Sequence, residues 1–216
     1  MILVKPSTEI LSVTPDALKL IEIAGRTCYK SEHKITEESS YDFIRMILKK
    51  GHESVLEHAS MTVRFIVDRG VSHEIVRHRL ASYSQESTRY CDYNNDHVTF
   101  IIPSWINDVP EGTFYDLLCI TKSSFLWFNT MLNIEWVYKD LRNKGWRPEH
   151  ARSVLPNSLK TEIVMTANLR EWRHFFKLRT SSAAHPQMRE AAVPLLKNTK
   201  SLIPIVFDDI LSNTIN

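Results

Sequence analysis

Hydrophobic and polar positions repeat along this chain with a period near 3.6 in some stretches and near two in others. The first pattern is typical of helices and the second of strands. Together they predict an α+β fold in one helix-rich domain covering residues 1–216, with a mixed or antiparallel sheet. Helices are expected at 14–29, 39–51, 73–80, 113–143, 148–155, 168–179 and from 186 onward, and strands at 1–5, 61–67, 98–102 and 161–166.

The ends of these helices have recognisable capping residues. Asn168 is followed three positions later by Glu171, which is a variant of the capping box. Pro186 begins the last helix, and a kink is expected at Pro194. Residues 81–96 are polar and rich in hydroxyl groups, so a loop is predicted there. The expected N-caps are Thr14, Ser39 or Ser40, and Asn168, and the expected terminators are Gly51 and Gly145.

Glycine is scarce. The chain has five glycines in 216 residues, and the closest two, Gly51 and Gly70, are nineteen positions apart. The dinucleotide fingerprint and the P-loop both need glycines within about six residues of each other. Both are excluded, so a bound nucleotide or flavin must be held by side chains.

The rest of the composition is that of a soluble globular protein, with 43% hydrophobic and 24% charged residues. A formal net charge of +2 gives no overall field that would draw the chain onto nucleic acid or a membrane surface. We see no signal peptide and no apolar run long enough to span a bilayer. Three widely spaced cysteines fit a reducing compartment. We therefore expect a cytoplasmic protein with no nucleic-acid or membrane partner.

The densest group of chemically useful residues begins at Arg77-His78-Arg79. On the expected helix, successive side chains are 100° apart, so Arg77 and Arg79 would point about 200° apart. That geometry suits two ligands, or one ligand and a neighbouring subunit. A solvated basic helix end, stabilised by the helix dipole, is the alternative.

Hydroxyl groups, an amide and another arginine follow this triplet. Arginine together with hydroxyl groups can hold a phosphate without glycine. The amide can pair with the imide edge of a pyrimidine or a flavin. An ordinary polar surface loop is the alternative. The residues concerned are Ser82, Ser84, Gln85, Ser87, Thr88 and Arg89.

The helix at 168–179 places Arg179 on the same face as Trp172, Phe175 and Phe176. A charge on an apolar face needs an acid or an anionic ligand as its partner, unless its stem packs and its head reaches solvent. Arg152 could turn inward in the same way.

Neither metal binding nor cysteine catalysis is favoured. His52 and His58 are six residues apart, and His73 and His78 are five apart, which is unsuitable for one helix face. We therefore expect no metal. The cysteines have no neighbouring histidine in sequence to activate them.

The motif Arg77-His78-Arg79, seven residues and then Ser87 resembles the RHR-x7-S signature of flavin-dependent thymidylate synthases. The similarity extends over most of the chain. The segment that begins Gly51-His52-Glu53-Ser54 resembles the family's segment before the signature. The later segments 151–156, 167–170 and 178–179 resemble its C-terminal motifs in order and spacing.

This resemblance implies a homotetramer that binds FAD and builds each active site from several subunits. The reaction would transfer a methylene group from methylenetetrahydrofolate to C5 of dUMP, and flavin hydride drawn from NADPH would complete dTMP. A flavin enzyme of the same fold that modifies another pyrimidine nucleotide, for example by hydroxymethylation, is one alternative. A non-catalytic nucleic-acid-binding protein is a second.

The resemblance also assigns residues. Arg179 would polarise the uracil and favour loss of the N3 proton, and Ser87 would bind and orient the substrate without acting as a nucleophile. The family's FAD contacts fall on Ser54, Arg77, His78, Arg79, Gln85, Asn168, Leu169, Arg170 and His174. Its dUMP contacts fall on Glu74, Ile75, Val76, Arg77, Gln85, Glu86, Ser87, Thr88, Arg89, Arg152 and Arg179.

This chain departs from some relatives at three of these places. Ser84-Gln85 stands where others have Asn-Glu, which replaces an anion by a neutral amide. Glu74 stands where a glutamine occurs, so an acid would lie close to the dUMP phosphate. His174 stands where an asparagine can occur.

Overall fold

The computed structural model describes residues 1–114 and 122–210. In the first of its two sheets, β1 (Ile2–Val4) runs parallel to β5 (Thr99–Ile101) and antiparallel to β6 (Gly112–Thr113). The second sheet has the order β2-β3-β7-β4, formed by Ser7–Val13, Ser60–Asp68, Lys160–Asn168 and Ala81–Gln85. The predicted α+β class with a mixed sheet is confirmed.

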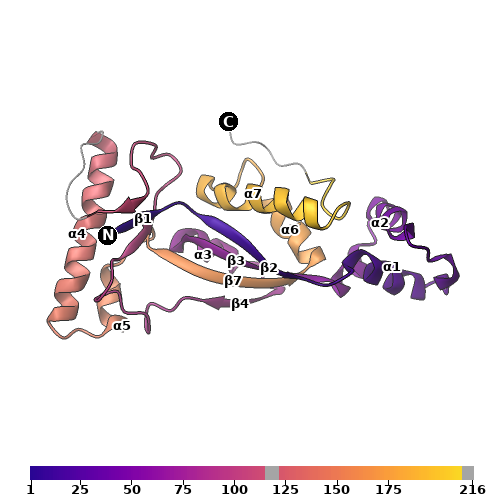
Figure 1. Ribbon diagram of the computed structural model, residues 1–216, viewed down its shortest axis with the longest axis horizontal. Coiled ribbons are helices and arrows are strands. Elements are labelled where there is room, and N and C mark those ends of the chain that lie inside the picture. Colours follow the sequence, from indigo (N-terminus) through magenta and orange to yellow (C-terminus); the bar gives the residue numbers. More distant parts are fainter. Residues whose placement is uncertain (115–121, 211–216) are drawn as a thin grey trace. The chain divides into compact units, whose positions relative to one another are not determined.

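Helices lie between these strands along the chain (Figure 1). Short 3₁₀ helices, η1 (Glu32–Lys34), η2 (Glu53–His58) and η3 (Arg152–Val154), lie in the connections. The α-helices are α1 (Ala17–Thr27), α2 (Ser39–Lys49), α3 (Arg69–Ile75), α4 (Lys122–Asn143), α5 (Pro148–Ala151), α6 (Leu169–Arg179) and α7 (Pro186–Leu202).

Contacts group the chain into two compact units, and the chain passes between them several times. Unit 1 consists of residues 1–7, 65–76 and 84–163, and unit 2 of residues 8–64, 77–83 and 164–216. The single domain expected over 1–216 remains a prediction.

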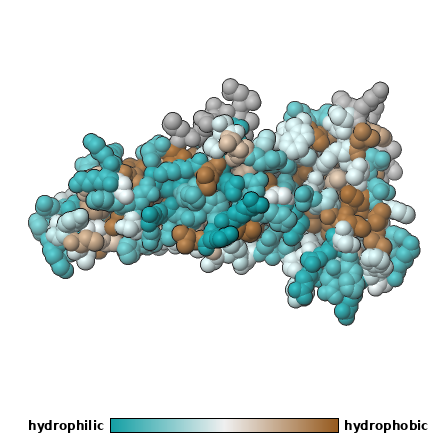
Figure 2. Space-filling model, turned by 180° about the vertical axis from the view of Figure 1, so that it is seen from behind, coloured by the Kyte–Doolittle hydropathy of each residue, from teal (hydrophilic) through white to brown (hydrophobic). Residues whose placement is uncertain are grey.

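The core of unit 1 forms where β1, β5 and α4 meet. Leu3, Phe100 and Phe128 are fully buried, and Tyr138 packs with them. Some large apolar side chains of this unit stay outside: Trp136 on α4 is 65% exposed. On the face drawn in Figure 2, hydrophobic residues gather in the part of the chain that contains α4 in Figure 1.

The core of unit 2 is aromatic. Trp172, Phe175 and Phe176 of α6 are all fully buried, and the Phe176 ring packs edge-on against Phe207 at 5.5 Å. The indole nitrogen of Trp172 donates to the carbonyl oxygen of Met61 in β3 at 2.9 Å. This hydrogen bond satisfies the one polar atom of a side chain that otherwise contributes only apolar burial.

Most predicted elements are present, and the caps explain why. Asn168 accepts a hydrogen bond from the backbone nitrogen of Glu171 at 2.9 Å, which confirms the predicted N-cap of α6. Gly51 (φ +70°) follows α2, and Gly145 (φ +89°) lies two residues beyond α4, where a left-handed residue ends a helix most easily. Pro148 and Pro186 each stand at a helix start.

Two predicted N-caps are wrong. Thr14 does not begin α1, because its hydroxyl accepts a hydrogen bond from the backbone nitrogen of Ser60 at 2.9 Å, which ties it to β3. The helix begins at Ala17 after Asp16, whose φ is +47°. Ser39 is the first residue of α2, and its hydroxyl accepts from Thr36 and donates to Glu22.

Three further expectations are corrected. Strands β2 and β4 lie where no strand was predicted, and β4 occupies the start of the expected loop at 81–96. The helix expected at 73–80 is α3, which starts earlier, capped by Asp68, and ends at Ile75. The helix expected at 113–143 begins later, since Thr113 belongs to β6; residues 115–121 of that prediction lie outside the described residues.

None of the helices in the described ranges combines the length and apolar character needed to cross a bilayer.

Gly25 lets α1 approach α2 closely. A Cβ atom at this position would lie 2.4 Å from Cζ of Phe43, a side chain that is only 8% exposed. We therefore expect Gly25→Ala to destabilise the protein, because overpacking costs about 1–3 kcal/mol and exceeds the gain in helix propensity of about 1 kcal/mol. Urea unfolding measures this. The double variant Gly25→Ala with Phe43→Leu is the control: its loss should be smaller than the sum of the two single losses. A Gly25→Ala protein as stable as the parent would contradict the close approach.

Candidate functional site

The Arg77-His78-Arg79 triplet lies in the turn and connection after α3, not on a helix as predicted. His78 is buried, at 4% exposure, while its neighbours Arg77 and Arg79 are both exposed. Neither arginine forms an ion pair with a residue in the described ranges. The two cations are therefore available to ligands.

The His78 ring is held at both nitrogens. Its Nδ1 lies 3.0 Å from Oε1 of Glu171, and its Nε2 accepts from Nε of Arg179 at 3.1 Å. The ring also packs against His174 and Phe175, with centroids 5.4 and 4.9 Å away. The fold thus joins residues 101 positions apart in sequence.

Burial lowers the pKa of His78 below its usual range, and the charge of Arg179 acts in the same direction. The hydrogen bond to Glu171 opposes these effects without overcoming them. The neighbouring Tyr83 donates its hydroxyl to the carbonyl oxygen of His78 at 2.6 Å. Burial, followed by the Glu171 charge, raises the pKa of Tyr83 to about 12. Near neutral pH both His78 and Tyr83 are uncharged.

Glu171 was not predicted as a site residue, although it is 7% exposed and contacts His78 directly. The sequence indicated only its part in the α6 cap. The sequence feature that could have indicated a buried role for Glu171 is its position next to Trp172 on an aromatic helix. Arg179 was expected to pair with an acid or an anionic ligand, and one partner that the fold gives it is the neutral ring of His78.

Arg173 is a second residue that sequence reasoning missed. It is 2% exposed and its guanidinium joins Glu53 of η2, at 3.1 Å, to Asp209, at 2.6 Å. A buried arginine is tolerated only when carboxylates compensate its charge. The pair with Glu53 connects α6 to η2, and the pair with Asp209 connects α6 to the segment after α7.

A cavity of about 490 Å³ opens beside η2 and α6. Three residues of the predicted FAD set line it, Asn168, Arg170 and His174. Arg170 donates to Glu57 across it at 2.6 Å. The possible ligand atoms of His78, Glu171 and His174 lie within 4.8 Å of one another, but both ring nitrogens of His78 are already used in hydrogen bonds.

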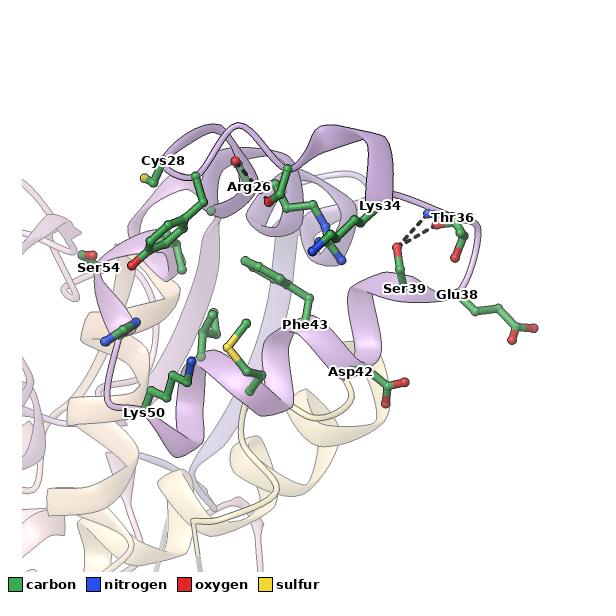
Figure 3. A pocket seen from close by; sticks show the side chains of 17 residues that line it. Arg26, Cys28, Lys34, Thr36, Glu38, Ser39, Asp42, Phe43, Lys50 and Ser54 are labelled. Carbon is green, nitrogen blue, oxygen red and sulfur yellow. Dashed lines mark hydrogen bonds between the residues drawn. The ribbon is translucent and has the colours of Figure 1, made fainter.

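A larger cavity, about 1060 Å³, lies between α1 and α2, and Ser54 of the FAD set lines it (Figure 3). The Phe43 ring projects into the space between these helices. Lys34, Lys50 and His52 supply basic groups around it. Ser54 therefore faces a different cavity from Asn168, Arg170 and His174.

Strand β4 sorts the next group of predicted residues onto two faces. Its burial alternates, with Tyr83 and Gln85 inward and Ser82 and Ser84 outward. Nε2 of Gln85 donates to the hydroxyls of Ser72 at 2.9 Å and Thr161 at 3.1 Å. The hydroxyls expected to form one group with Gln85 are thus divided, and Ser82 and Ser84 lie on the other face.

After β4 the chain makes a tight turn at Ser87. The Ser87 carbonyl oxygen accepts from the backbone nitrogens of Tyr90 and Cys91, and its hydroxyl accepts from the nitrogen of Arg89. Arg152 is exposed, so the expected inward turn is wrong, but its guanidinium donates to the Thr88 hydroxyl at 3.2 Å and joins two residues of the dUMP set. The guanidinium of Arg89 is exposed and lies over the Tyr90 ring.

The acids of the dUMP set have partners of their own. Glu86 accepts from the Tyr93 hydroxyl at 2.7 Å and from Lys160 at 3.1 Å. Burial raises the pKa of Tyr93 above its usual range, and the hydrogen bond to Glu86 acts in the same direction. Glu74, Ile75 and Val76 form the last turn of α3 and its cap, and Ile75 is buried.

The predicted FAD-binding residues and the predicted dUMP-binding residues lie mostly in different units. The FAD set lies in unit 2, except for Gln85, and the dUMP set lies in unit 1, except for Arg77 and Arg179. Each unit by itself therefore contains most of one predicted ligand site.

Comparison with known proteins identifies the family. A family model described as thymidylate synthase complementing protein matches residues 9–205. The flavin-dependent thymidylate synthase of Geobacter sulfurreducens is 34% identical over 207 residues, covering 93% of this chain and 84% of that protein. The enzyme of the same name from Mycobacterium avium is 36% identical over 198 residues, covering 88% and 78%.

Solved structures show the same fold. The UMP/dUMP methylase PolB from Streptomyces cacaoi, bound with 5-Br dUMP, superposes with a TM-score of 0.77 at 24% identity over 96% of each chain. Thymidylate Synthase X from Helicobacter pylori, with FAD and dUMP, superposes with a TM-score of 0.76 at 22% identity, over 95% of this chain and 99% of that one.

The chain belongs to the flavin-dependent thymidylate synthase family. The predicted family, the thymidylate-forming methyltransferase activity and FAD as its cofactor are confirmed. The roles of individual residues rest on the resemblance and the geometry, and they are proposals.

The Arg173 pair predicts a pH-dependent stability. The hydrogen bond from Arg173 holds the pKa of Asp209 below its usual range, so this carboxylate stabilises the fold above the unfolded-state pKa of about 3.9 and stops doing so as pH falls through its folded value. Asp209 is 53% exposed, so we expect Asp209→Asn to cost only about 1 kcal/mol at neutral pH.

This loss should shrink towards zero as the pH falls through the lowered, folded-state pKa of Asp209. Urea unfolding of parent and variant at several pH values tests it. The exposed pair of Asp42 and Arg45 on α2 is the control, and Asp42→Asn should change stability little at any pH. An equal loss for Asp209→Asn at neutral and acidic pH would contradict the assignment.

Proposed function

We propose that this chain converts dUMP to dTMP with methylenetetrahydrofolate as one-carbon donor and NADPH as reductant. It works as a cytoplasmic homotetramer whose subunits share active sites. What supports this proposal is that residues assigned by the family signature meet in the fold: His78 contacts Arg179, 101 positions away, and Thr88 contacts Arg152, 64 positions away.

The residues present suit FAD. Its pyrophosphate needs cations or amides, and because the chain has no glycine-rich loop, arginines must supply them. Arg77 and Arg79 are exposed, and Arg170 lines the smaller cavity with Asn168 and His174. Bound flavin supplies the hydride that reduces the transferred carbon. The protein's own part is binding and orientation.

The turn at Ser87 and the arginines around it suit the dUMP phosphate. Arg89 is an exposed guanidinium directly after the turn, and Arg152 approaches the same turn through Thr88. The Glu86 carboxylate is bound by Lys160 and Tyr93, which compensates its charge near an anionic ligand. Ser87 binds and orients the substrate.

Gln85 keeps one function of the glutamate found in some relatives. Because Nε2 donates to Ser72 and Thr161, its Oε1 remains the group that can accept a hydrogen bond from a ligand N–H. The imide of uracil or flavin offers such an N–H. The amide therefore supplies an acceptor without a negative charge.

Arg179 supplies the electrostatic part of catalysis. A guanidinium beside the pyrimidine stabilises negative charge that develops when N3 loses its proton, and this raises the electron density at C5. Its Nε is held by His78, and the terminal nitrogens are the other donors of the guanidinium.

The function is tested with the purified protein and dUMP tritiated at C5. Tritium release should require both methylenetetrahydrofolate and NADPH, and the flavin absorption bands should be visible. Product mass separates methylation from hydroxymethylation, and the same assay with UMP tests the other nucleotide. A protein that cannot be reconstituted with FAD would refute the proposal.

Arg179→Ala tests the catalytic role. We expect turnover to fall by roughly 100- to 1,000-fold, the usual cost of removing one charge-stabilising donor. Flavin content should stay at the parent level, because the cofactor's other contacts are intact. Tritium release and absorbance measure the two quantities, and parent-like turnover would exclude the role.

Arg89→Ala tests phosphate binding. Loss of a charge-assisted hydrogen bond should weaken dUMP binding roughly 10- to 100-fold. Arg147→Ala is the matched control, since Arg147 is an exposed arginine of the same unit whose partner is Glu149. Calorimetric titration with dUMP measures both. Equal affinities in the two variants would contradict the assignment of Arg89.

A further inference from the structure

Three side chains of unit 2 form a continuous chain of hydrogen bonds. Glu171 lies in the first turn of α6 and Arg179 is its last residue, while His78 lies between them on the connection after α3. The two distances are 3.0 Å, from His78 Nδ1 to Glu171 Oε1, and 3.1 Å, from Arg179 Nε to His78 Nε2. His78 and Glu171 are 4% and 7% exposed, so water competes little for these contacts.

Arg179 and Glu171 together determine which nitrogen of the His78 ring carries the proton. The Nε of arginine always carries hydrogen and can only donate, so Nε2 of His78 must present a lone pair. An ionised carboxylate can only accept, so Nδ1 must carry the proton. Both neighbours therefore select one neutral tautomer of His78, with hydrogen on Nδ1.

A carboxylate is well placed to do this. Glu171 stands at the N-terminal end of α6, where the helix dipole favours negative charge, and Asn168 caps the same turn through the Glu171 backbone nitrogen. Arg179 stands at the C-terminal end, where a cation is favoured. The dipole of α6 stabilises the charges of both Glu171 and Arg179, and burial keeps the His78 ring between them neutral.

A metal ion is the competing use of this cluster, because His174 lies near the same atoms. A metal bound at Nδ1 of His78 would displace that proton to Nε2, where it would face the N–H of Arg179. Two donors cannot share a hydrogen bond. The contact with Arg179 thus favours the tautomer-fixing arrangement.

We propose that Glu171 is a positioning residue for the reaction: by holding His78 in its Nδ1-protonated tautomer, it fixes the orientation of the Arg179 guanidinium. This inference rests on the role proposed for Arg179 in activating the pyrimidine. Without the carboxylate, His78 can also adopt the Nε2-protonated tautomer, which cannot accept from Arg179. The guanidinium then loses its Nε contact with the ring, which is one of the contacts that orient it.

Two variants of Glu171 separate the hydrogen bond from packing. Glu171→Leu keeps a similar volume but removes the acceptor, and Glu171→Gln retains a carbonyl oxygen that can still accept from Nδ1. We expect turnover in Glu171→Leu to fall roughly 10- to 100-fold, as when a supporting hydrogen-bond partner is removed. Glu171→Gln should recover most of this loss. Because Glu171 also lines the smaller cavity, turnover is expressed per bound flavin in both variants.

Glu9→Ala is the control for removing a carboxylate from the same unit, since Glu9 is exposed and pairs with Arg64 at the surface. It should behave as the parent. Parent-like turnover of Glu171→Leu would overturn the proposal, and so would a Glu171→Gln variant as impaired as Glu171→Leu.

The tautomer itself is read without any reaction, by ¹⁵N NMR of histidine-labelled, flavin-free protein, with the His78 signal assigned from its absence in His78→Gln. We expect a protonated Nδ1 and an unprotonated Nε2 in the parent and in Glu171→Gln, and a mixture of tautomers in Glu171→Leu. An Nε2-protonated or doubly protonated ring in the parent overturns the proposal.

The tautomer measurement also separates the proposed role of Arg179 from the proposed role of Glu171. If the parent shows the expected tautomer but Arg179→Ala keeps its turnover, the proposed role of Arg179 fails. If Arg179 is required but Glu171→Leu leaves both tautomer and turnover unchanged, only the positioning role of Glu171 fails.

Discussion

The burial of one histidine side chain determines how the signature segment is displayed. His78 has both ring nitrogens bonded within unit 2, so its side chain must point inward. Its two neighbours in sequence, Arg77 and Arg79, are both exposed. The signature segment therefore presents two cations beside one buried ring.

The same arrangement explains how the chain manages without a glycine-rich loop. Such a loop offers backbone amides to a phosphate, whereas this chain offers arginine side chains that must be held in place. Arg170 is held by Glu57, Arg179 by His78, and Arg152 contacts Thr88. The buried Arg173 is held by Glu53 and Asp209, which secures η2 against α6. Acids and neutral groups of the protein therefore set the geometry of its cations.

The sequence predicted most elements of the fold, because the buried face of each long helix and strand repeats with the right period. It failed where local pattern and tertiary contact disagree. Thr14 has every local mark of an N-cap, but Ser60 of β3 takes its hydroxyl. Strand β4 carries hydroxyl groups on its exposed face, which made a strand look like a loop.

The sequence likewise predicted some residues of the candidate site and missed others. The resemblance supplied the arginines, because the family's motifs contain them. It did not supply Glu171 or Arg173, whose contacts lie within the protein and depend on segments far apart in sequence. A buried acid that touches only a histidine has no motif of its own, and only the folded chain reveals its partner.

The position of β4 gives a physical reason for the fixed seven-residue spacing of the signature. The strand, Ala81–Gln85, lies between the arginine–histidine triplet and Ser87. Its side chains alternate between two faces, with Tyr83 bonded to the His78 carbonyl and Gln85 bonded to Ser72 and Thr161. Adding or removing one residue here would reverse the faces of everything that follows. Tyr83 and Gln85 could not then both keep their partners, so the spacing records the register of a strand that ends at Gln85, a residue of both predicted ligand sets.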